Sequence, residues 1–168
     1  MIAVLLLLAG ATIASTPDLG KAEGQCRADE RGPAYLVDIT GLKDRVGRLK
    51  LELYPASDTD FLADDNRLIA AGKAFARVEA PVPASGPVHL CIRAPAPGTY
   101  ALALLHDRDA NRRFALSIDG VGFATNPRLG LAKPRAAAAS AAVGAGPTRI
   151  GIIVNYRRGL LSFGPARE

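Results

Sequence analysis

The chain contains no tryptophan, and aromatic residues make up only 5% of its 168 positions. Proteins that bind single-stranded nucleic acid stack the bases on aromatic side chains placed among basic residues. The adjacent pairs Arg112-Arg113 and Arg157-Arg158 do not belong to such an alternating run. We therefore expect no nucleic-acid partner, although the formal net charge is +5. Anionic polysaccharide, lipid head groups or another envelope protein fit this charge better, and a solvated basic surface without a partner is the alternative.

Histidine and cysteine are equally scarce, with two residues of each. A zinc site needs more nitrogen and sulfur ligands than His89 and His106 supply once the cysteines pair. The sequence also lacks a Ser-His-Asp or Cys-His pattern and a phosphate-binding glycine loop. We therefore expect neither a cofactor nor an enzymatic activity.

The apolar run at residues 1–14 is too short to span a bilayer. It resembles a secretory signal peptide, because small residues follow the apolar stretch and Ala14 offers a cleavage site. The basic start of such a signal is missing, since the first Lys or Arg is Lys21. Either the true start lies upstream or the signal is weak, and a buried N-terminal strand or helix is the alternative. Export predicts a periplasmic or secreted protein of the Gram-negative envelope.

Export also predicts one disulfide, because an even number of cysteines in an oxidising compartment tends to pair. A bond between Cys26 and Cys91 would fasten the polar N-terminal segment 15–33 to the rest of the chain. In the chain-entropy model it would stabilise the fold by about 4 kcal/mol. Two unpaired thiols are the alternative.

Seventeen glycines and twelve prolines predict many turns, and hence many short strands. The turn Pro97-Gly98 is followed by a strand, residues 99–107, whose two faces are both apolar. A strand covered on both faces lies inside its sheet, so we expect this one to be central. Five further strands are expected at 35–40, 48–54, 73–82, 88–93 and 148–156.

The connections between these strands carry their own predictions. Residues 41–47 are expected to join the first two strands as a hairpin, with Leu49, Leu51 and Leu53 facing inward and Arg48, Lys50 and Glu52 outward. The acidic insertion 55–72 can hold one helical turn, with Phe61 and Leu62 packed onto the sheet. The alanine-rich stretch 132–146 suits a helix or a strand, and its position before a Gly-Pro turn favours a strand.

Six to eight strands without a long helix predict an all-β fold, a single antiparallel β-sandwich over residues 34–156. Residues 157–168 are expected to form a loose C-terminal tail.

Several short motifs resemble one protein family. They are Thr40-Gly41-Leu42, Gly47-Arg48-Leu49, Pro97-Gly98-Thr99-Tyr100-Ala101, His106-Asp107 and Gly122-Phe123-Ala124-Thr125-Asn126. In this order they resemble the exported bacterial domain-of-unknown-function family 2141. The resemblance implies a transthyretin-like or carboxypeptidase-regulatory-like sandwich and no assigned activity.

The chain departs from the family in the polar loop after His106. The usual pattern resembles His-Asp-x-Asn-x-Asn-Gly-x-x-Asp, but Arg112 stands where the glycine belongs and no acid follows until Asp119. Asp107, Asp109 and Asn111 are spaced like the first three ligands of a calcium loop. Without the glycine and the distal acid, an ordinary Asx-turn loop is the better interpretation. The alternative is a cation-binding domain or a cation-dependent enzyme that uses His106, Asp107, Asp109 and Asn111.

We expect His106 to bond to a loop carbonyl rather than to act as a catalyst. Its neighbour Asp107 points to the opposite face, so the two do not form a dyad. The leading hypothesis is a non-enzymatic binding or structural module of the envelope that uses the loops 107–113 and 120–126. The candidate binding residues are His106, Asp107, Asp109, Asn111, Arg112, Arg113, Phe123 and Asn126.

Overall fold

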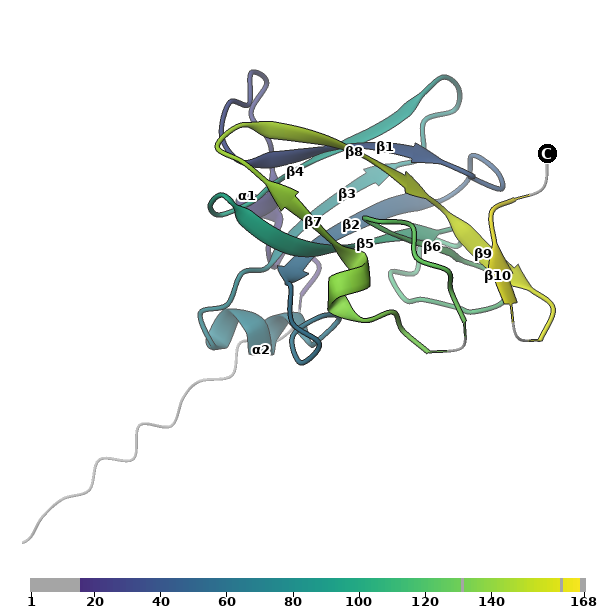
Figure 1. Cartoon of the computed structure of the whole chain (residues 1–168). Helices are drawn as coiled ribbons and strands as arrows, with labels where there is room; N and C mark the ends of the chain where they lie inside the picture. The colour runs from purple at the N-terminus through teal and green to yellow at the C-terminus, as the bar shows by residue number, and fades with distance from the viewer. Residues whose placement is uncertain (1–15, 131, 161, 167–168) are drawn as a thin grey trace, which may run out of the picture.

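The structure is a computed structural model and describes residues 16–130, 132–160 and 162–166. Within these residues the chain is built almost entirely of strands in two sheets, with short helical segments at the margins (Figure 1). The strands are β1 Ala34–Thr40, β2 Arg48–Pro55, β3 Ala76–Pro81, β4 Val88–Arg93, β5 Gly98–Asp107, β6 Gly120–Phe123, β7 Ser140–Val143, β8 Pro147–Ile153, β9 Asn155–Arg158 and β10 Ser162–Gly164. The helices are α1 Lys21–Gly24, α2 Asp65–Ala70 and the 3-10 turn η1 Ala136–Ala139.

The all-β class is confirmed, and β5 is the central strand of the larger sheet. That sheet has the order β10-β9-β6-β5-β2-β3, and β7 also pairs with β5. One face of β5 places Leu102 and Leu104 in the core shared with the smaller sheet, β4-β1-β8. The other face places Ala101 and Ala103 in a second apolar cluster outside that core. The two apolar faces therefore correspond to two separate packing layers.

The expected hairpin at residues 41–47 is wrong. β1 pairs with β4 and β8, whereas β2 pairs with β3 and β5, so the segment crosses from one sheet to the other. The inward leucines of β2 are fully buried, as predicted, but they face β1 across the core instead of lying beside it. Alternation identifies the buried face of a strand and not its pairing partner, because two strands with apolar inner faces can pair or can stack.

Two further expectations about the strands need correction. The sandwich is not wholly antiparallel, because β1 and β8 pair in parallel. The strand expected at 148–156 divides at Val154: β8 belongs to the smaller sheet and β9 to the larger. The short strands β6, β7, β9 and β10 raise the number in the described residues to ten, above the six to eight expected. The transthyretin-like assignment stays a prediction.

The acidic insertion covers part of the outer face of the larger sheet. Its helix α2 has the side chain of Asp64 as N-cap, bonded to the N–H of Asn66. Phe61 is fully buried and packs edge-on against Tyr54 of β2, at 5.8 Å between ring centroids. Leu62 was expected to pack down beside it but is 40% exposed, because its backbone turns at φ 60°.

The N-terminal segment is fastened to the sheets by the predicted disulfide between Cys26 and Cys91. Gln25 forms an isolated β-bridge with Ile92 of β4, and α1 lies against β3. The proposed signal peptide, residues 1–14, lies outside the described residues. Among the described helices, none has the length and apolar character that a membrane-spanning helix needs.

The C-terminal part is more ordered than expected. Residues 157 and 158 complete β9, and β10 pairs with β9 as the edge of the larger sheet, so the loose tail predicted for 157–168 is wrong for these residues. The alanine-rich stretch contains both of the structures that the sequence left open. The turn η1 is followed by β7, which pairs with the start of β5.

Candidate functional site

The polar loop between β5 and β6 is closed from the inside by two buried carboxylates. Asp107, 2% exposed, accepts the backbone N–H of Asn111 at 3.1 Å and of Arg112 at 2.7 Å. Asp119, 1% exposed, accepts the N–H of Arg108 at 2.9 Å and of Ala115 at 2.7 Å. These bonds replace the strand pairing that the loop backbone lacks. The predicted Asx turns are made by Asp109 and Asn111, whose side-chain oxygens accept the N–H of Asn111 at 3.3 Å and of Arg113 at 2.7 Å.

The same loop brings three acidic side chains together. Carboxylate oxygens of Asp107, Asp109 and Asp119 lie within 4.8 Å of one another. Asp119 thus joins two of the three residues whose spacing resembles a calcium loop, while the amide oxygen of the third, Asn111, accepts the N–H of Arg113. Burial, together with the neighbouring acids, raises the pKa of Asp107. Most of these oxygens already accept backbone hydrogens, so the cluster first serves to hold the loop.

His106 is fully buried, and both of its ring nitrogens have partners. Nε2 lies 2.8 Å from the carbonyl oxygen of Val46, and Nδ1 lies 2.5 Å from the hydroxyl of Tyr156. Because Nε2 faces a carbonyl oxygen it carries the ring proton, and Nδ1 of the neutral ring accepts from the Tyr156 hydroxyl, which in turn accepts the N–H of Lys43 at 3.0 Å. Burial lowers the pKa of His106 accordingly. His106 therefore joins β5 to the segment 41–47 and to β9.

Asn126 also has a structural role. Its amide donates to the carbonyl of Gly151 at 2.9 Å and accepts the N–H of Ile153 at 2.7 Å. Both groups belong to β8, which lies at the edge of the smaller sheet. The side chain therefore occupies backbone groups that an open strand edge would offer to another chain.

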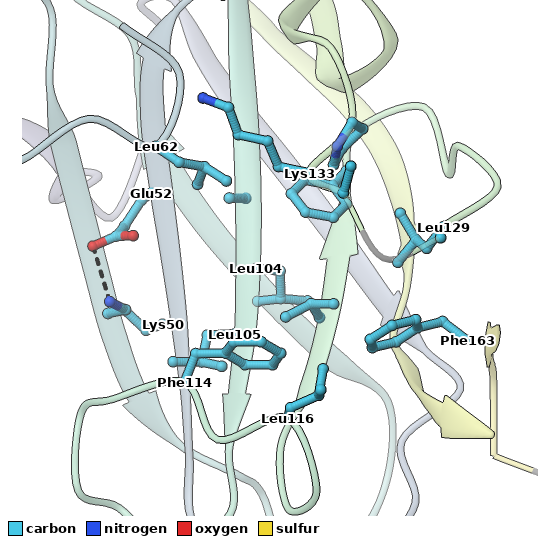
Figure 2. Close-up of a pocket in the computed structure, with 16 residues that line it drawn as sticks. Lys50, Glu52, Leu62, Leu104, Leu105, Phe114, Leu116, Leu129, Lys133 and Phe163 are labelled. Atoms are coloured by element: carbon cyan, nitrogen blue, oxygen red, sulfur yellow. Dashed lines mark ion pairs between the residues drawn. The ribbon is translucent and has the colours of Figure 1, made fainter. Parts of the chain in front are cut away.

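An apolar groove of about 370 Å³ lies on the outer face of the larger sheet, where the insertion leaves it uncovered. Its floor is formed by Ala103 and Leu105 of β5 and by Val121 and Phe123 of β6. Figure 2 shows Lys50 and Glu52 at one margin, and Leu129 with Phe163 of β10 at the opposite margin. Its other lining residues include Leu62, Phe114, Leu116, Ala132, Lys133 and Pro134.

The groove displays apolar side chains that the fold leaves exposed to water. Phe114 is 49% exposed and Leu116 is 39% exposed, although both line the groove. They stand in the loop that Asp107 and Asp119 close, so the polar loop holds an apolar wall in place. A volume of this size with a mostly hydrophobic lining and a few charged groups is typical of small-molecule sites.

A basic cleft of about 420 Å³ adjoins the groove, and Lys50 lines both of them. Arg112 and Arg113 from the polar loop also line the cleft. Its main acid, Glu79, is shared by three cations, since Lys21, Arg48 and Arg112 lie 3.2 to 3.5 Å from the same carboxylate oxygen. Positive charge therefore exceeds negative charge at this end of the groove.

A buried ion-pair network borders both sites, since Glu52 lines the groove and Arg77 and Asp65 line the cleft. Glu52, expected to face solvent, is only 6% exposed. Its carboxylate accepts from Arg77 Nε at 2.8 Å and from the hydroxyl of Tyr54 at 2.8 Å. Arg77 also bonds Asp65 of α2 at 2.9 Å, which fastens the insertion to β3.

The predicted site residues thus fall into two groups. His106, Asp107, Asp109 and Asn126 hold the framework through hydrogen bonds, whereas Asn111, Arg112, Arg113 and Phe123 line the groove or the cleft. Sequence reasoning missed Phe114 and Leu116, whose apolar side chains at alternate positions after a charged loop were the available signal. It also missed Leu129, Lys133 and Phe163, which come from segments that only the fold brings to this face.

Comparison with protein-family models identifies a bacterial family. No curated protein and no solved structure matches the chain. Residues 37–151 match the family described as "Uncharacterized protein conserved in bacteria (DUF2141)". The match spans more than half of the chain and runs from within β1 to within β8. The chain therefore belongs to this bacterial family, as its motifs predicted.

Proposed function

We propose that the protein is an exported, non-enzymatic binding module of the bacterial cell envelope that holds an apolar ligand in the groove. The loops 107–113 and 120–126 contribute to this site through Arg112 and Arg113 in the cleft and Phe123 in the groove. The disulfide fits an oxidising compartment.

One observation carries the proposal: Phe114 and Leu116 are held exposed beside an apolar floor. Exposed apolar side chains gathered in a groove have an energetic cost in water, and such patches commonly mark binding sites. The fold supports them with two buried carboxylates and so keeps them from collapsing onto the sheet. A rigid wall of this kind lowers the ordering cost of binding.

The test is saturable binding of the neutral apolar dye N-phenylnaphthylamine, followed by its fluorescence. The double variant Phe114→Ser, Leu116→Asp should weaken dye binding by about tenfold or more, because a carboxylate and a hydroxyl replace apolar contacts. Leu160→Asp is the matched control, since Leu160 is 79% exposed and does not line the groove. Equal dye binding by the double variant and the wild type would contradict the proposal.

A second candidate, a bound cation at the polar loop, is favoured by the three close carboxylates. If calcium binds the native state alone, a concentration one hundred times its Kd stabilises the fold by about 2.7 kcal/mol. The melting temperature should then rise with calcium and fall with a chelator, and Asp109→Asn should abolish the response. An unchanged melting temperature in both conditions excludes this candidate.

A further inference from the structure

We propose that the ligand of the groove is a single-chain amphiphile with an anionic head group, bound with its chain along the groove and its head in the basic cleft. This inference rests on the proposed function and names the chemical class of its ligand. The supporting observation is that the apolar groove and the basic cleft adjoin each other at Lys50.

The apolar groove and the basic cleft meet at Lys50. The Nζ atom of Lys50 lies 3.2 Å from Glu52, and its side chain is 19% exposed. Glu52 also bonds Arg77 and Tyr54, so its single negative charge is shared between Lys50 and Arg77. Lys50 and Arg77 together balance Glu52 and Asp65, so the surplus positive charge near the junction is that of Arg112 and Arg113 in the cleft. An anionic group bound there would leave an attached chain lying over Leu105 and Phe123.

The polar loop places two arginines, Arg112 and Arg113, in the basic cleft. Among the residues that the structure describes, the guanidinium of Arg112 pairs with the shared carboxylate of Glu79 alone, at 3.5 Å, and its side chain is 43% exposed. Arg113 is exposed, and within the described part of the chain no ion pair involves its guanidinium. Guanidinium groups with free donors bind carboxylates and phosphates through charge-assisted bonds.

The opposite end of the groove has a different character. Leu129 and Phe163 form that margin in Figure 2, and Leu116 lies below them. Lys133, the remaining cation of the lining, donates to the carbonyl of Phe61 at 2.7 Å and so contributes less to head-group binding. The site therefore has one polar end and one apolar end, which is the pattern of an amphiphile rather than of a wholly apolar ligand or a free anion.

The test compares ligands that differ only in the head group. Dodecanoate, dodecyl phosphate, dodecanol and dodecyltrimethylammonium, each below its micelle concentration, are titrated against N-phenylnaphthylamine bound to the protein at low salt. The two anions should displace the dye at concentrations about five to ten times lower than dodecanol, and the cation should be the weakest. The advantage of the anions should shrink at high salt.

The variant Arg112→Ser, Arg113→Ser should remove most of this advantage of the anions and leave the concentration at which dodecanol displaces the dye unchanged. The control Arg31→Ser, Arg67→Ser removes the same charge from exposed residues outside both sites and should preserve the advantage of the anions over dodecanol. Equal displacement by all four compounds would overturn the head-group inference and leave the groove function intact. Failure of the dye itself to bind would refute the proposed function, and a doubled mass in light scattering with no dye binding would assign the groove to a second copy of the chain.

Discussion

The buried network around Arg77 gives the sharpest prediction about stability. The Arg77 side chain is 9% exposed and bonds Glu52 at 2.8 Å, Asp65 at 2.9 Å and the carbonyl of Thr16 at 3.0 Å. Arg77→Met keeps much of the apolar stem but removes the guanidinium from two buried carboxylates. Breaking a buried pair from one side costs about 3–5 kcal/mol, because the remaining charge loses its compensation. Lys50 remains near Glu52, which places the expected loss at about 3 kcal/mol.

Urea unfolding followed by circular dichroism measures this loss, since the chain has no tryptophan for fluorescence. The double variant Arg77→Met, Glu52→Gln should recover part of the loss, because it no longer buries the Glu52 charge. Arg112→Met is the matched control: its pair with Glu79 is 3.5 Å long and its side chain is 43% exposed, so we expect a change below about 0.5 kcal/mol. A loss below about 1 kcal/mol for Arg77→Met would refute the claim that this network joins the insertion to the sheet.

Three further predictions concern the framework. Cys26→Ser with Cys91→Ser should lower the free energy of unfolding by about 2–5 kcal/mol, and a reductant added to the wild type should reproduce this in urea titrations. Gly122→Ala should lower the free energy of unfolding by about 1–3 kcal/mol, since a Cβ there would lie 2.5 Å from Ile152 Cγ2 and 2.8 Å from the Ile153 carbonyl oxygen. The control Gly144→Ala, which has open space around it, should cause no measurable loss in the same titration. Because burial lowers the pKa of His106, the histidine takes up a proton at a higher pH in the unfolded chain than in the folded one. The contribution of His106 to the free energy of unfolding should therefore be complete above about pH 6.5 and decrease below it, and a plot of urea midpoint against pH should be flatter below about pH 6.5 for His106→Gln.

Much of the architecture could be predicted from local patterns. The bounds expected for β4 agree with the structure, and those for β1, β2 and β5 agree within one residue. These strands alternate or are apolar on both faces, and flanking turns fix their ends. What alternation cannot determine is which strands pair. The parallel pairing of β1 with β8 joins residues more than one hundred positions apart, and no local signal specifies it.

The same holds for the candidate site: features set by neighbouring residues in the sequence could be predicted, whereas those assembled by the fold could not. The polar loop was found because the Asx turns of Asp109 and Asn111 are local, and His106 was correctly assigned a loop carbonyl as partner. The groove was not found, because its floor and walls come from β5, β6, β10, the insertion and the segment before η1. Glu52 was assigned to solvent because alternation predicts only its face, and the insertion that buries it comes later in the chain.

The central claim is that the groove on the larger sheet binds the apolar part of a ligand. It is tested most directly by nuclear magnetic resonance, with methyl and amide signals followed during titration with dodecanoate. We predict saturable shifts at Leu105, Leu116 and Val121, with amide shifts at Arg112 and Arg113 and none at the exposed Leu160. Shifts confined to other faces of the molecule, or an unchanged spectrum at saturating ligand, would contradict the account.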